Sequence, residues 1–167
     1  MQEKNIGTFE VKSGKICVSD PCYDRGTWCA AWGLLAKNGI WDATFYTSDE
    51  GSWGHRIARI EARHKDTLND IWKKHKTEIG VDSGQAGIYD SKIYPQGNTG
   101  DYGECGTFYG RCCDITLKEP GAGIIDGGGI VSRSGFGDGG YDLEVQYDGK
   151  EIVAARVTFI PEAFERN

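Results

Sequence analysis

Three aspartates are the residues of this sequence best suited to chemistry or to ligand binding. Asp20, Asp82 and Asp138 each stand where an expected strand meets a loop, and two of them lie among glycines. Carboxylates gathered at one end of a domain could hold Ca²⁺ or Mg²⁺, or could divide acid and base roles between them. Each could instead accept backbone N–H bonds and fix its own turn. The run Asp-Gly-Gly-Gly at 126–129 lacks the ligand spacing of an EF-hand. We therefore assign no metal ligand and no catalytic residue.

The glycine-rich stretch 130–141 is the second feature with binding potential. Successive glycine N–H groups can bind an anion, and Arg133 could add a forked contact to a phosphate. Phe136, Tyr141 and Tyr89 could offer rings on which a base stacks. The stretch is no Walker loop, because it lacks Gly-Lys-Ser/Thr, and a strand rather than a helix is expected after it. The alternative is a glycine-rich bulge that bends a strand. The predicted ligand-binding residues are Asp20, Asp82, Gln85, Ser132, Arg133, Ser134, Phe136, Gly137, Asp138 and Tyr141.

The cysteines and histidines show no spacing typical of a zinc site or of a nucleophile–histidine pair. The chain has six cysteines, and the adjacent Cys112 and Cys113 would point to opposite faces of a strand. We therefore expect thiols that are mostly buried. His55 and His64 have no serine or cysteine at a known catalytic spacing, although a pair assembled in space stays open.

Length and composition indicate a single folded domain spanning residues 1–167. The chain is 38% hydrophobic and has 25 glycines, many of them between residues 80 and 140, which suggests many tight turns. Its net charge of −6 is unfavourable for direct nucleic-acid binding. The sequence has neither an apolar run of membrane-spanning length nor a signal-peptide core. We expect a cytoplasmic protein with no membrane partner and no cofactor.

Alternating apolar residues predict a mainly β fold, either a β-sandwich or a partly closed barrel. Ala58, Ile60 and Ala62 share one face of an expected strand at 55–63. Apolar alternation on both sides of Asp148-Gly149 predicts a hairpin near the end of the chain. The other expected strands are 6–12, 15–19, 28–35, 41–47, 79–89, 107–117 and 129–134.

One amphipathic α-helix is expected at about 66–77. Asp66 or Thr67 can cap its first turn, and the basic run 73–76 would fill its last turn, where cations suit the helix dipole. The residues at helical spacing are Leu68, Ile71, Trp72 and His75.

Three motifs in chain order resemble a domain of unknown function found in uncharacterised bacterial and bacteriophage proteins. They are SDPCY at 19–23, VDSGQAG at 81–87 and SGFGDGGY at 134–141. The resemblance implies a β-rich fold and a phage or mobile-element origin. It implies no activity and no catalytic residue.

Together these features favour a non-enzymatic binding module that binds or sequesters a small polar ligand, such as a nucleotide signal, in the manner of an anti-defence protein. One alternative is an inhibitor that contacts a host protein through an acidic surface, with binding lost at high salt. Another alternative is a small metal-dependent hydrolase. The aromatic residues and glycine-rich strands are also compatible with a homo-oligomer.

Overall fold

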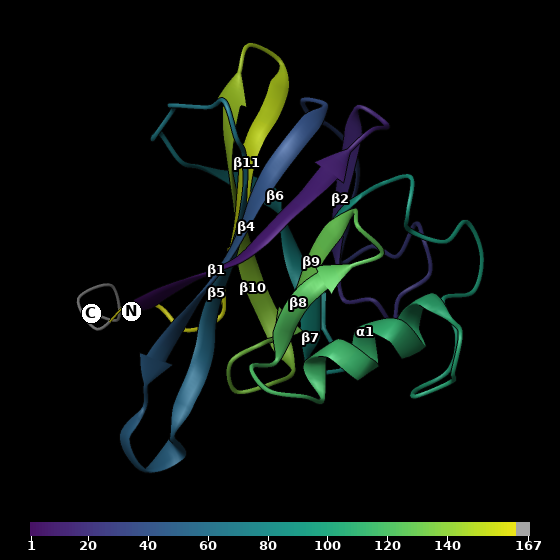
Figure 1. Cartoon of the computed structure of the whole chain (residues 1–167), viewed down its shortest axis with the longest axis vertical. Helices are drawn as coiled ribbons and strands as arrows, with labels where there is room; N and C mark the ends of the chain where they lie inside the picture. Colours follow the sequence, from purple (N-terminus) through teal and green to yellow (C-terminus); the bar gives the residue numbers. More distant parts are fainter. Residues whose placement is uncertain (163–167) are drawn as a thin grey trace.

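Two antiparallel sheets pack face to face in the computed structural model, which describes residues 1–162 (Figure 1). The first sheet, sheet A, has the strand order β1 (Gln2–Val11), β4 (Gly39–Asp49), β5 (His55–His64), β11 (Glu151–Thr158), β10 (Gly139–Asp148) and β6 (Lys73–Val81). The second, sheet B, has the order β3 (Ala31–Leu35), β2 (Lys15–Ser19), β7 (Gln85–Asp90), β9 (Gly129–Arg133) and β8 (Ala122–Ile125). The sheets do not close into a barrel, so the mainly β prediction is confirmed in its sandwich form.

The main core lies between the two sheets and is built by alternation along the strands. Phe45, Ile60, Val157 and Leu143 form one cross-strand row over β4, β5, β11 and β10, and all four side chains are buried. Sheet B contributes Ile16, Val18, Ile88 and Ile130 to the same core. Neighbouring apolar side chains on one sheet face are the unit that stabilises such a sandwich.

A second, smaller core lies on the outer face of sheet B, under helix α1 (Phe108–Thr116). The rings of Tyr89, Tyr94 and Phe108 meet edge to face there, with centroids 5.0–5.5 Å apart. Cys112 packs into the same cluster. The helix covers sheet B, whereas no helix of residues 1–162 lies over the outer face of sheet A (Figure 1). No helix of residues 1–162 is long and apolar enough to cross a membrane.

The strand predicted at 107–117 is wrong, because this segment forms α1. Thr107 caps the helix by accepting a hydrogen bond from the Gly110 N–H at 3.0 Å. Phe108 and Cys112 stand four residues apart and therefore share the face that enters the second core. The cysteines thus sit on a helix, where both Cys112 and Cys113 are buried.

The helix predicted at 66–77 is also wrong. Residues 73–81 form β6, in which Ile79 lies opposite Tyr141 of β10 and belongs to the main core. Leu68 and Ile71, expected on the apolar helix face, are 99% and 65% exposed. Pairing with β10 and burial of Ile79 outweigh the local helical spacing. The basic run 73–76 starts this edge strand, where lysines discourage pairing with other chains.

The terminal hairpin is confirmed with a shift of one residue. Asp148 pairs with Glu151, so the two-residue turn is Gly149-Lys150 rather than Asp148-Gly149. Gly149 has a φ of +61°, a conformation that favours glycine. The strand expected at 15–19 is observed with the same bounds as β2.

Candidate functional site

The predicted ligand-binding residues gather around the turn 82–85 and the loop 134–138. Asp20 is the anchor of this region, because four hydrogen bonds converge on its buried carboxylate. The N–H groups of Cys22, Asp82 and Ser83 and the Ser83 hydroxyl donate them, at 2.6–2.8 Å. Each carboxylate oxygen accepts two of these bonds, so both are used by the fold. Asp20 therefore fixes a turn, which is the alternative that the sequence left open.

Asp82 and Asp138 are exposed, and the three aspartate loops meet around residues 82–84. The Tyr23 hydroxyl donates to Oδ2 of Asp82 at 2.7 Å, and the Gly84 N–H donates to Oδ1 of Asp138 at 3.1 Å. Burial and the bond to Asp82 raise the pKa of Tyr23 well above its usual value. Tyr23 therefore stays a neutral hydroxyl, which donates a hydrogen bond to the Asp82 carboxylate.

The loop 134–138 is held by its own hydrogen bonds. Ser134 Oγ and Tyr141 Oη donate to the Gly137 carbonyl at 2.9 and 2.6 Å, and the Gly137 N–H donates to the Ser134 carbonyl at 3.0 Å. Ser134 and Tyr141 therefore shape the loop. The Gly137 N–H, expected to bind an anion, already has an internal partner.

Gln85 of β7 lies opposite Arg133, and Ser132 of β9 lies opposite Ala86. Both Gln85 and Ser132 are buried. The Gln85 amide donates to the sulfur of Cys113 at 3.5 Å, and the Ser132 hydroxyl donates to the Arg133 carbonyl at 2.8 Å. Both side chains face the interior of the protein. Four of the ten predicted residues thus remain well placed to meet a ligand. They are Asp82, Asp138, Arg133 and Phe136.

Asp82 and Asp138 line one hollow, Arg133 lines a second, and Phe136 directly follows Gly135 of the second in the chain. The first, which we call the acidic cleft, has a volume of about 480 Å³. Three carboxylates line it and no basic side chain does. Trp28 stands at its wall with 89% of its surface exposed. The lining residues are Tyr23, Trp28, Cys29, Glu78, Gly80, Val81, Asp82, Asp138, Gly139 and Gly140.

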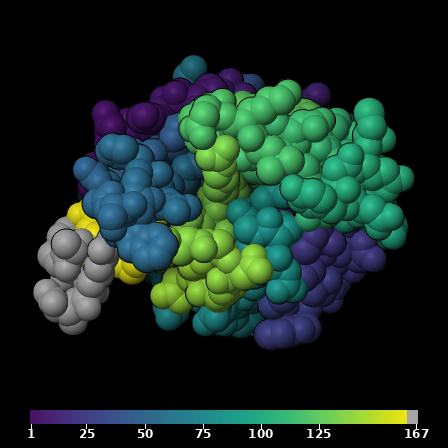
Figure 2. All heavy atoms as spheres, turned by 90° about the horizontal axis from the view of Figure 1, so that it is seen from below, coloured from purple at the N-terminus to yellow at the C-terminus, as the bar shows by residue number. Residues whose placement is uncertain are grey.

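The second hollow, which we call the basic hollow, has a volume of about 180 Å³ and opens at the end of the sandwich where the β4–β5 hairpin extends past sheet B. Figure 2 views this end: the blue hairpin residues and the green residues around α1 flank a recess with yellow-green residues at its floor. Four side chains in its wall are basic, and one is acidic. The lining residues are Lys4, Phe45, Thr47, His55, Arg56, Ile57, Glu119, Pro120, Arg133 and Gly135.

Arg133 is held in place by the residues that follow α1. Its Nε donates to the Thr116 carbonyl at 2.6 Å, and one terminal nitrogen pairs with Glu119 at 3.0 Å. The guanidinium is therefore preorganised at the wall of the hollow, and 40% of the Arg133 side chain is exposed. A fixed, partly exposed guanidinium is suited to binding an anion.

Lys4, His55 and Arg56 were not predicted as site residues. Lys4 lies opposite Phe45 in the β1–β4 ladder, and the other two open β5. Only the pairing of three strands and the packing of the two sheets bring them beside Arg133. The local cluster Trp53, His55 and Arg56 is the one feature of the sequence that could have drawn attention to this hairpin.

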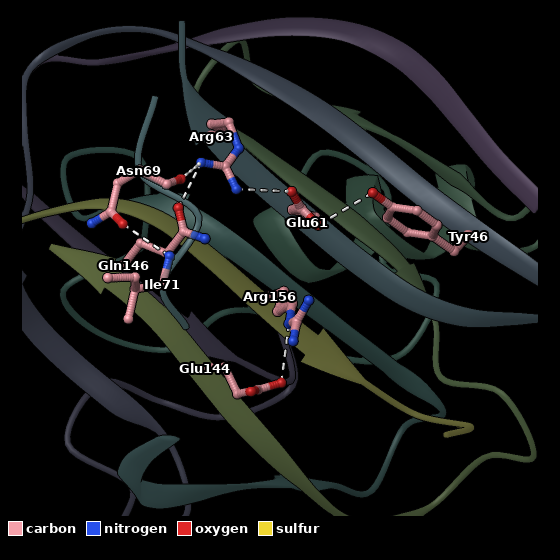
Figure 3. Close-up of polar contacts among 8 residues, drawn as sticks. All are labelled: Tyr46, Glu61, Arg63, Asn69, Ile71, Glu144, Gln146 and Arg156. Carbon is pink, nitrogen blue, oxygen red and sulfur yellow. Dashed lines mark hydrogen bonds and ion pairs between the residues drawn. The ribbon is translucent and has the colours of Figure 1, made fainter. Parts of the chain in front are cut away.

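Besides the two hollows, the outer face of sheet A carries a network of polar side chains, whose charges are paired with one another (Figure 3). Arg63 donates to Oε1 of Gln146 at 2.6 Å and lies 3.5 Å from a Glu61 oxygen. Arg156 pairs with Glu144 at 3.0 Å. The Arg156–Glu144 pair joins β11 to β10, and cross-strand pairs of opposite charge stabilise a sheet, so we interpret this network as structural.

The described residues offer no metal site and no disulfide. Within residues 1–162 no group of three His, Cys, Asp or Glu side chains is placed to hold a metal ion. All six cysteines are free thiols, of which Cys105 is exposed and Cys22 partly exposed. Burial and the nearby Asp20 carboxylate raise the pKa of Cys22, which disfavours a reactive thiolate there.

Comparisons of the chain with protein-family models, curated proteins and solved structures find no match. The family resemblance, the phage origin, the cytoplasmic location and the homo-oligomer therefore stay predictions.

Proposed function

We propose that this protein is a non-enzymatic binding module that holds a small phosphate-bearing ligand in the basic hollow. One observation carries the proposal: three cationic side chains, Lys4, Arg56 and Arg133, together with the imidazole of His55, surround a single hollow in a chain whose net charge is −6. Like charges repel when they are brought together, so the cations of this cluster cost stability by their mutual repulsion. A bound anion offsets that cost.

The paired contacts of this region leave positive charge for a ligand. Glu119 neutralises only one of the basic side chains, Arg133. Within residues 1–162 the side chains of Lys4 and His55 make no hydrogen bond or ion pair. A phosphate group is the small ligand that suits several converging cations, because its oxygens accept charge-assisted hydrogen bonds from each of them.

The proposal is tested by calorimetric titration with ribose 5-phosphate at low ionic strength. Arg56→Gln and Lys4→Gln should each weaken binding about tenfold, as expected when one charge-assisted contact worth ~1.5 kcal/mol is lost. Arg111→Gln is the matched control, since Arg111 pairs with Asp126 beside α1 and does not line the hollow. Unchanged affinity in both test variants, or no binding by the native protein, would exclude this function.

A second candidate function is the binding of a basic partner protein at the acidic cleft. The observation that favours it is the combination of Glu78, Asp82 and Asp138 with the exposed ring of Trp28. Carboxylates and an open indole together attract the ammonium or guanidinium of a partner side chain. Binding of an octa-arginine peptide that disappears in the Asp138→Asn, Glu78→Gln double variant would support it, and equal binding by that variant would argue against it.

A further inference from the structure

Two exposed aromatic rings meet beside Arg56, one of the residues that line the basic hollow. Trp53 and Phe136 are 68% and 56% exposed, and their centroids lie 6.3 Å apart at an angle of 84°. Trp53 ends the short 3₁₀ turn between β4 and β5, and Phe136 lies in loop 134–138. Neither ring belongs to either of the buried cores. The contact therefore joins the β4–β5 hairpin to loop 134–138 at the protein surface, and much of both rings is exposed to water.

Arg56 connects this aromatic pair to the basic hollow. It lines the hollow, and its guanidinium carbon lies 5.6 Å from the centroid of the Phe136 ring. Its Nε donates to the Trp53 carbonyl at 3.0 Å, which fixes the side chain between the two features. An anion bound in the hollow would therefore carry the rest of its molecule past Arg56 toward the two rings.

The size of the hollow limits what it can enclose. Pockets that take a whole drug-sized ligand have volumes of roughly 300–1,000 Å³. The basic hollow has about 180 Å³, which suits a phosphate group with part of a sugar. Any larger ligand must leave its remaining part outside the hollow, and the exposed rings lie next to Arg56 in its wall.

From this arrangement, and resting on the proposed function, we propose that the ligand is a nucleotide, with its phosphate in the basic hollow and its base on the Trp53–Phe136 pair. Every base has a π face, so stacking on an open aromatic pair holds a base with little regard to its identity. The Arg56 guanidinium contacts both the phosphate and the ring system. The site thereby recognises the joined phosphate and base, and neither part binds as well alone.

The test compares adenosine 5′-monophosphate with ribose 5-phosphate, which differ only in the base, by calorimetric titration of the whole chain. The native protein should bind the nucleotide about tenfold more tightly, the ratio that stacking worth ~1.4 kcal/mol gives. Trp53→Leu and Phe136→Leu should each remove that advantage and leave the affinity for ribose 5-phosphate unchanged. Trp28→Leu is the matched control, because Trp28 is another exposed indole but stands at the acidic cleft.

The possible outcomes distinguish a failure of this inference from a failure of the proposed function. Equal affinity for the two probes in the native protein would overturn base recognition while leaving phosphate binding intact. A nucleotide advantage that survives in both aromatic variants would also overturn it, and would mean that the two rings only fasten the loop to the hairpin. Absence of binding for both probes would overturn the inference together with the proposed function.

Discussion

The Ser83 hydroxyl donates a hydrogen bond of 2.6 Å to Oδ1 of Asp20, and the Ser83 N–H donates one of 2.7 Å to Oδ2 of the same carboxylate. Ser83 therefore meets both oxygens of a side chain that has no exposed surface. This contact joins the turn that follows β2 of sheet B to the turn between β6 and β7, through which the chain passes from sheet A to sheet B. Asp20 thus stabilises the arrangement on which the loops around both hollows depend.

Asp20→Asn should lower the free energy of unfolding by about 2–4 kcal/mol, because an amide nitrogen would face N–H donors and charged hydrogen bonds would be lost. Denaturation in guanidinium chloride measures the change. Asp82→Asn is the control, because Asp82 is exposed and its carboxylate accepts one hydrogen bond, from the Tyr23 hydroxyl. This substitution should lower the free energy of unfolding by less than ~1 kcal/mol. Equal costs for the two variants would contradict the anchoring role of Asp20.

Gly87→Ala should destabilise the sandwich by about 1–3 kcal/mol through overpacking. A Cβ at Gly87 would lie 2.3 Å from the Tyr89 ring and 2.6 Å from the Ile130 carbonyl oxygen, inside sheet B. Gly97→Ala provides the comparison, since a Cβ there meets nothing within 4 Å. Thermal unfolding of both variants measures the difference. If Gly87→Ala is as stable as Gly97→Ala, the Tyr89 ring can shift to make room for the added methyl group, which would contradict the prediction.

Trp72→Ala should expose the segment 65–72 to proteases. The Trp72 ring lies 4.2 Å from the Arg156 guanidinium and 5.5 Å from that of Arg63, and these contacts hold the segment over the outer face of sheet A. A cation–π contact of this kind is worth roughly 0.5–2 kcal/mol. Limited tryptic digestion should cleave after Lys65 sooner in this variant, whereas Trp53→Ala should digest like the native protein. An unchanged rate after Trp72→Ala would mean that Asn69, whose carbonyl accepts a hydrogen bond from Arg63 and whose amide donates one to the Tyr147 carbonyl, is enough to hold the segment.

The protein should lose stability in alkaline solution. Burial raises the pKa of Cys17 to about 12, and burial likewise raises the pKa of Cys112, Tyr89 and Tyr94. A group whose pKa is raised on folding contributes stability below its unfolded pKa, about 8.5 for cysteine, and loses that contribution as the pH rises toward the folded value.

The free energy of unfolding should therefore fall between about pH 9 and pH 12, with up to ~1.4 kcal/mol per pH unit from each group. Denaturation at pH 8 and pH 10.5 measures the fall. Cys17→Ala should show a shallower slope because one of the titrating thiols is gone. Identical stability of the native protein at both pH values would refute the prediction.

The sequence determined the features that depend on residues close together in the chain. The alternation of Ala58, Ile60 and Ala62 in β5 and the turn near Asp148 predicted strands and a hairpin correctly, because strand periodicity and turn chemistry are local. The aspartates and segment 132–141 were singled out because loops between strands often carry function, and a ligand-binding role for them stays a prediction.

Only the tertiary structure decided which elements the ambiguous segments form and what the site contains. Segment 73–81 forms a strand because it pairs with β10 and this pairing buries Ile79 in the main core. Segment 108–116 forms a helix because Phe108 and Cys112 are then buried together against the outer face of sheet B. Lys4 and Arg56 came beside Arg133 only through strand pairing and sheet packing. These contacts join residues distant in the chain, and their free energy depends on the whole fold, so no local pattern in the sequence records them.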